Sequence, residues 1–194
     1  VVRFRDEGIR VVRRGNSAAQ LIQSDNREVT IVTIDPAVRA VLPSDASQVA
    51  VELSSLIGPG DNLALTLAAT VIRYGQRVEN LTVTRAGNPE VQLPVRAIPS
   101  EQTCPSSDEC AYRQTFAVPL RPEMVFSRAR SGSPLELRVG IDGQAMSVAI
   151  PGEQLQLLTE VIATEMSARA SRSSQSAQTD PVIPAASPPP APAA

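Results

Sequence analysis

The two cysteines are the residues of this chain whose spacing most narrowly limits the chemistry they could perform. Cys104 and Cys110 are separated by five residues in the polar segment Pro99–Cys110. A metal site would need two more soft ligands, but the chain has no histidine and no third cysteine. A redox pair favours C-x-x-C spacing at a helix N-terminus, and neither is present. We therefore favour a structural disulfide, which would place the chain in an oxidising compartment.

Few other side chains suggest catalysis. The chain lacks histidine and lysine, so it lacks the commonest general base and the amine of a Schiff base. The G-x-S-x-G, G-x-G-x-x-G, P-loop, H-E-x-x-H and EF-hand patterns are absent. Twenty acidic residues leave a hydrolase with paired carboxylates open as an alternative. We expect no enzyme, and we assign no catalytic, cofactor-binding or metal-binding residue.

Composition and charge restrict the class of partner. The net charge is −2, so the chain carries no field that would attract nucleic acid. No apolar run approaches 18 residues, so we expect no membrane-spanning helix. The 18 basic residues are all arginine, which together with abundant Ala, Val and Pro indicates a GC-rich bacterial genome. The chain begins at Val1 without a signal peptide, so we expect that a leader was removed or the chain trimmed.

Four segments with alternating apolar residues accompany the cysteine loop: two flank it, and two follow it in the chain. Val91–Ile98 and Ala111–Val118 flank the loop, and both have the residue pattern of strands. Two further strands, Leu135–Ile141 and Gln144–Ile150, are separated by Asp142-Gly143. Asp-Gly between alternating segments predicts a hairpin, because a type I′ turn requires positive φ at both central positions.

The first half of the chain predicts further short strands. Glu28–Ile34 is apolar on both faces and should be central in its sheet. Glycine and proline in residues 58–61 predict a turn. Near the start, we expect a hairpin of Val1–Arg5 with Ile9–Arg13, and a capping box at Ser17–Gln20 that begins a short helix. The remaining expected strands are Gln48–Ser54, Leu63–Tyr74 and Val78–Thr84.

The end of the chain divides into a helix and a tail. An apolar stripe predicts an amphipathic helix over Glu153–Met166. The segment 167–194 is rich in Ser, Pro and Ala, so we expect it to be disordered and a chain ending at Ala168 to be as stable as the whole. The predicted fold is a mainly β, antiparallel sandwich-like domain over residues 1–166, with a C-terminal amphipathic helix and a disordered Pro/Ala-rich tail over 167–194.

From Val91 to Ile162 the chain resembles uncharacterised β domains of Gram-negative envelope proteins, many of them lipoproteins. The shared features are the two-cysteine hairpin loop, the alternation after Cys110, the L-x-L-x-V strand, the Asp-Gly turn, the Val148–Pro151 segment and an amphipathic helix. This resemblance covers about a third of the chain and implies a periplasmic or lipid-anchored location. It transfers no catalytic residue.

These features favour a non-catalytic binding or structural protein of the bacterial cell envelope. Its partner would be an envelope protein or a cell-wall component. The cysteine loop is the first candidate contact surface, because a covalently closed loop loses less conformational entropy on binding. Asp108 and Glu109 at its tip would select a basic partner, although a solvated acidic loop remains the simpler interpretation. The alternative function is a carboxylate-dependent hydrolase acting in the envelope.

Overall fold

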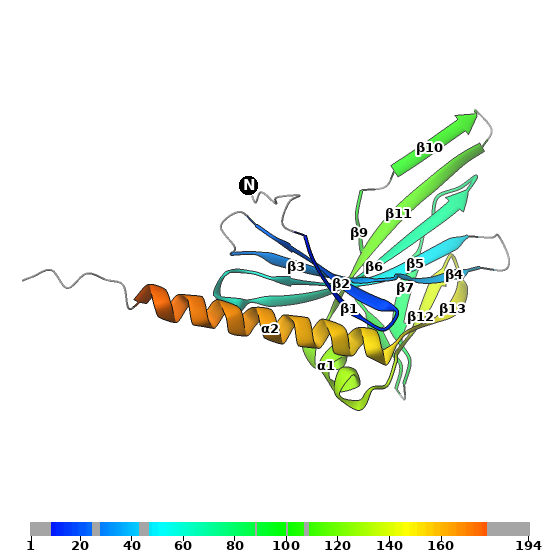
Figure 1. Cartoon of the computed structure of the whole chain (residues 1–194). Coiled ribbons are helices and arrows are strands. Elements are labelled where there is room, and N and C mark those ends of the chain that lie inside the picture. Colours follow the sequence, from blue (N-terminus) through cyan, green and yellow to red (C-terminus); the bar gives the residue numbers. More distant parts are fainter. Residues whose placement is uncertain are drawn as a thin grey trace, which may run out of the picture.

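The described part of the chain folds into two antiparallel β-sheets and two α-helices (Figure 1). The computed structural model describes residues 9–24, 28–42, 47–87, 89–99, 101–106 and 109–177. The large sheet has nine strands, with the order β1-β2-β3-β5-β6-β11-β10, while β4 pairs beside β5 and β9 beside β11. The small sheet has the order β13-β12-β7-β8. The mainly β, antiparallel architecture expected from the sequence is therefore confirmed.

The strands and helices have the following residue ranges. The strands of the large sheet are β1 (Arg10–Arg14), β2 (Ser17–Gln23), β3 (Thr30–Asp35), β4 (Val38–Val41), β5 (Gln48–Ile57), β6 (Leu63–Tyr74), β9 (Arg96–Ala97), β10 (Glu101–Ser106) and β11 (Glu109–Leu120). The strands of the small sheet are β7 (Leu81–Arg85), β8 (Val91–Leu93), β12 (Leu135–Ile141) and β13 (Gln144–Ile150). The helices are α1 (Pro122–Ser131), α2 (Gly152–Ala177) and the 3-10 turn η2 (Pro59–Asp61).

Alternating apolar residues define the centre of the large sheet. β5 and β6 pair in continuous register from Gln48↔Ile72 to Ile57↔Leu63, and β11 continues the sheet on the far side of β6. Side chains on one face of these strands are buried, as a period of two requires. The central position expected for β3 is confirmed, because β3 pairs with both β2 and β5.

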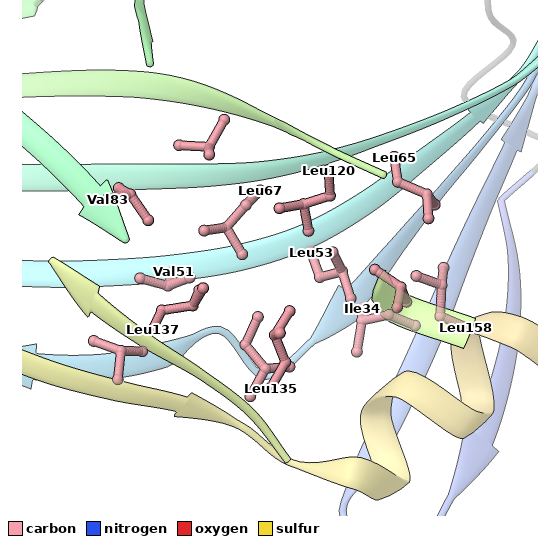
Figure 2. Packing of buried hydrophobic residues seen from close by; sticks show 14 of the residues in the cluster. Ile34, Val51, Leu53, Leu65, Leu67, Val83, Leu120, Leu135, Leu137 and Leu158 are labelled. Atoms are coloured by element: carbon pink, nitrogen blue, oxygen red, sulfur yellow. The ribbon is translucent and has the colours of Figure 1, made fainter. Parts of the chain in front are cut away.

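The core lies between the two sheets, which pack face to face. Figure 2 shows Val51 and Leu67 of the large sheet and Leu137 of β12 pointing into the same space. The hairpin predicted at Asp142-Gly143 is confirmed, with φ of 46° and 86° at its two turn residues. This turn joins β12 to β13, and both strands lie over the core.

The small sheet covers part of the large sheet, and the helices cover the rest. In Figure 1, α2 runs along β1, β2 and β3, with α1 beside its first half. The start of α2 packs against the end of α1, and this contact requires glycine. A Cβ on Gly152 would lie 2.2 Å from the carbonyl oxygen of Gly132. Gly132 also ends α1 with φ of 66°, a conformation that glycine adopts without strain.

The predicted short helix at Ser17–Gln20 is wrong, because these residues begin β2. Gly15 has φ of 55° and turns the chain, so that β1 and β2 form a hairpin. Ser17, Ala19 and Leu21 are then buried with a period of two. The Ser and Gln of the supposed capping box have no helix to cap. Tertiary pairing on both edges of β2 overrides the local signal.

Other predicted strands and helices differ from the structure in length or number. Val91–Ile98 forms two short strands, β8 and β9, which belong to different sheets and are separated at Pro94. The helix α1 was not expected at all. The first hairpin strand, Val1–Arg5, lies outside the described residues. Neither described α-helix is long and apolar enough to cross a membrane.

The boundary between helix and tail also needs correction. The helix expected to end at Met166 continues to Ala177, so residues 167–177 are helical; residues 178–194 lie outside the described part. Two side chains, Glu165 and Arg169, attach the second half of α2 to the large sheet. Glu165 is 1% exposed and accepts hydrogen bonds from Arg10 (2.9 Å) and Gln23 (2.6 Å). Arg169 donates to the carbonyl oxygens of Glu28, Ile57 and Gly58 and to the hydroxyl of Thr30, over 2.8–3.1 Å.

These contacts lead us to expect that a cut after Ala168 destabilises the fold, unlike the prediction from the sequence. Loss of Arg169 removes charge-assisted hydrogen bonds and leaves carbonyl groups just before β3 and at the end of β5 without this donor. We predict that Arg169→Ala destabilises the fold by about 2 kcal/mol, equivalent to about 4–8 °C in Tm. The chain ending at Ala168 should lose at least as much.

Thermal denaturation followed by circular dichroism measures both variants. Ser171→Ala is the matched control, because among the described residues the Ser171 hydroxyl donates a hydrogen bond to the carbonyl of Ser167 in its own helix and to no residue of the sheet. If Arg169→Ala melts within a degree of the control, the end of α2 contributes nothing to stability.

Candidate ligand-binding groove

A groove of about 850 Å³ opens between the small sheet and α1. Its floor comes from the ends of β7 and β8, and its opposite wall comes from the end of β11 and the first turns of α1. The volume lies in the range of small-molecule and peptide sites. The apolar part of the lining is Val91, Leu93, Pro94, Pro119, Leu120 and Met124.

One cation points into this apolar surface. Leu81 and Val83 of β7 are buried on the inner face of the small sheet, and Arg85 is the next residue on that face. Arg85 pairs in register with Leu137 on one side and with Val91 on the other. The sequence therefore places a guanidinium where the period of two would place a core side chain.

The guanidinium of Arg85 is incompletely satisfied. Its Nε is buried and has no hydrogen-bond partner within the described part of the chain, which also supplies no ion pair for Arg85. A buried donor without a partner costs about 1–3 kcal/mol, and more when it is charged. An anionic ligand group in the groove would remove this cost, because guanidinium binds carboxylate and phosphate in a two-pronged geometry.

The rim of the groove adds one further cation and one carboxylate. Arg121 precedes α1 and is exposed, and Glu123 lies in the first turn, where the helix dipole favours a negative charge. With Arg85, the groove has two cations against one carboxylate. Its electrostatic preference is therefore for an anion.

The predicted cysteine pair is found at bonding distance, with its sulfur atoms 2.11 Å apart. It joins β10 to β11 near the tip of a hairpin that projects at the opposite end of the molecule from α1 (Figure 1). Asp108 lies outside the described residues, as does the side chain of Glu109, whose backbone begins β11. The proposed acidic contact surface thus stays a prediction.

Asp142 at the hairpin turn links the two sheets. Its carboxylate accepts hydrogen bonds from the backbone N–H of Glu79 (3.0 Å) and Asn80 (2.8 Å) and from the guanidinium of Arg73 on β6. Burial alone would raise the pKa of Asp142, but the N–H donors and the Arg73 charge lower it below its ordinary value. Arg73 is only 6% exposed, so this pair joins the exposed β12–β13 turn of the small sheet to a buried side chain of the large sheet. We assign it a structural role.

The outer face of the large sheet carries the one carboxylate whose pKa is raised among the described groups. Burial raises the pKa of Glu52 on β5, and the neighbouring charge of Asp35 on β3 raises it further. A hydrolase that works with paired carboxylates needs two acidic side chains close together, and Glu52 and Asp35 are such a pair. Neither lines the groove. In the described part of the chain, no three His, Cys, Asp or Glu side chains gather to hold a metal ion.

Comparison with protein families, with curated proteins and with solved structures found no match for this chain. The arrangement of its own residues is therefore the basis for any functional conclusion.

Asp142 yields a prediction with a defined pH dependence. Because the pKa of Asp142 is lowered in the folded state, its ionised form stabilises the fold above the ordinary value of 3.8, and this contribution is lost as the pH falls through the folded-state pKa. We expect Asp142→Asn to cost about 1–3 kcal/mol at pH 7, because it removes the charge that faces buried Arg73.

Urea denaturation of the variant and the unmodified chain at pH 7 and at stepwise lower pH measures this difference. The gap in unfolding free energy should narrow below pH 3.8. A gap that is constant over the whole range would show that the Asp142 charge does not contribute. The exposed residue Glu136 on β12 provides the control Glu136→Gln.

Proposed function

We propose that this chain is a non-catalytic binding protein of the bacterial cell envelope, and that its groove takes a ligand combining an anionic group with an apolar part. The observation that carries this proposal is the Nε of Arg85, buried without a partner among the described residues beside the apolar side chains of the groove. Arg85 as a residue is only partly buried, but a buried N–H donor of a cation without a partner is unfavourable for folding alone. A binding function accounts for its presence.

The two parts of the ligand would contribute in different ways. The anionic group would form charge-assisted hydrogen bonds with Arg85 in a region of reduced dielectric constant. The apolar part would displace water from Val91, Pro94 and Pro119, the exposed apolar residues of the lining. Arg121 on the exposed rim would mainly increase the rate of association, because exposed charges are screened by salt.

The proposed location is the periplasm or cell envelope of a Gram-negative bacterium. The cysteine pair at bonding distance is compatible with an extracytoplasmic location, and the resemblance of residues 91–162 to envelope domains supports it. Alkylation of the protein in lysates of its source cells, before any reduction, tests this. Cys104 and Cys110 that alkylate freely would indicate a reducing compartment.

The alternative function is a carboxylate-dependent hydrolase. The raised pKa of Glu52 beside Asp35 is the observation that favours it, because a general acid must hold its proton near neutral pH. This alternative requires turnover of an envelope substrate that Glu52→Gln abolishes and Arg85→Gln leaves unchanged.

The binding proposal predicts the behaviour of a simple amphiphilic anion. Decanoate should bind to the protein, and Arg85→Gln should weaken its binding at least about tenfold, as expected when a charge-assisted hydrogen bond is lost. Decanol, which has no charge, should bind the variant and the unmodified chain equally. Isothermal titration calorimetry below the critical micelle concentration provides the measurement.

Arg138→Gln is the matched control. Arg138 lies on β12 of the same sheet, but it is 58% exposed on the outer face, 3.8 Å from Glu90. If Arg138→Gln weakens decanoate binding as much as Arg85→Gln, the effect is one of overall charge and the groove is not the site. Absence of decanoate binding to the unmodified chain would refute the proposed function.

A further inference from the structure

The strand beside the groove is an unpaired sheet edge. β8 is the last strand of the small sheet, and in the described part of the chain its backbone pairs with β7 alone, although the end of β11 lies nearby. Edge strands expose backbone N–H and C=O groups that can pair with an added chain, and many proteins cover or charge such edges to prevent this. Here the edge residues Val91, Gln92 and Leu93 instead line the open groove.

The groove thus combines an edge strand, a facing helix and a cation. An extended peptide can add its backbone to such an edge and direct alternate side chains into the cavity. β8 spans three residues, which is about 10 Å at roughly 3.3 Å per residue, so it can pair with a short terminal segment. The facing side chains of α1, Met124 and Ser127, would lie along the same segment.

The strand directions fix which terminus would meet the cation. β7 runs towards Arg85, and β8 returns antiparallel with Val91 opposite Arg85. A peptide added antiparallel to β8, as all strands of this sheet are paired, would run in the same direction as β7. Its C-terminus would therefore arrive beside Val91, at the end of the groove that Arg85 lines.

We propose that the groove binds the C-terminal end of a partner polypeptide, which adds to β8 as a fifth strand of the small sheet and places its α-carboxylate beside Arg85. This inference rests on the proposed function and names its ligand. The exposed apolar lining of Val91, Pro94 and Pro119 selects an aliphatic last residue. The α-carboxylate of the bound peptide supplies the anion. The backbone of the last peptide residues forms hydrogen bonds with the unpaired N–H and C=O groups of β8.

The probe is an equimolar pool of N-acetylated hexapeptides whose last residue is Leu, Ile or Val. One pool has free C-terminal carboxylates, and the second has the same sequences as C-terminal amides. Titration into ¹⁵N-labelled protein, followed by NMR, gives the apparent Kd and the backbone amides whose signals move. We expect the acid pool to bind at least about tenfold more tightly than the amide pool, with shifts at Gln92 and Leu93.

Arg85→Gln should abolish the preference for the acid pool, and Arg138→Gln should preserve it. The comparison of acid with amide on the unmodified chain stands even if Arg85→Gln does not fold. Equal binding of the two pools, or binding that leaves the β8 signals unmoved, would overturn the inference. Failure of the peptides with retained binding of decanoate would overturn it too but leave the proposed function standing, and failure of both ligands would overturn both.

Discussion

The large sheet has a wide apolar face that must be buried, and the rest of the structure depends on how that face is covered. The four-stranded small sheet covers the part around β5 and β6, where Val51 and Leu67 are fully or almost fully buried. The helices α1 and α2 cover the part that remains (Figure 1). The contact of Gly152 with Gly132 joins the two helices, and the ion pair of Asp142 with Arg73 joins the small sheet to the large one. The groove lies where the small sheet and α1 meet incompletely, so it is a consequence of covering one sheet with separate elements.

Local sequence pattern predicted the strands well and the helices less well. Alternation identified β5, β6, β11 and the β12–β13 hairpin, because a strand that is buried on one face repeats every two residues. The segment Arg121–Gly132 carries ordinary helix signals, including Pro122 at the first position, Glu123 in the first turn and Gly132 at the end, and attention to these would have revealed α1. The extent of α2 was not predictable from apolar periodicity, because Arg169 docks through hydrogen bonds to carbonyl groups that are distant in the sequence.

The candidate site could be predicted only in fragments. The cysteine pairing follows from the lack of other ligands, and Arg85 can be placed on an inner face from its spacing to Leu81 and Val83. The groove itself brings together residues 85, 91–94 and 119–127, and this proximity depends on strand order and on the position of α1. Reading a sequence detects catalytic and metal-binding motifs first, and the described residues of this site contain none of the motifs searched for. Its signal is a charged residue in a position that packing would give to an apolar one.

The central claim is that a ligand carboxylate in the groove lies against the guanidinium of Arg85, and the pKa of that carboxylate tests it most directly. The carboxyl carbon of [1-¹³C]decanoate bound to the protein can be titrated by NMR. A neighbouring cation favours the ionised form, whereas burial in an apolar cavity without a cation favours the neutral form. The account predicts a pKa for bound decanoate below that of the free acid. A bound pKa equal to or above that of the free acid would contradict it.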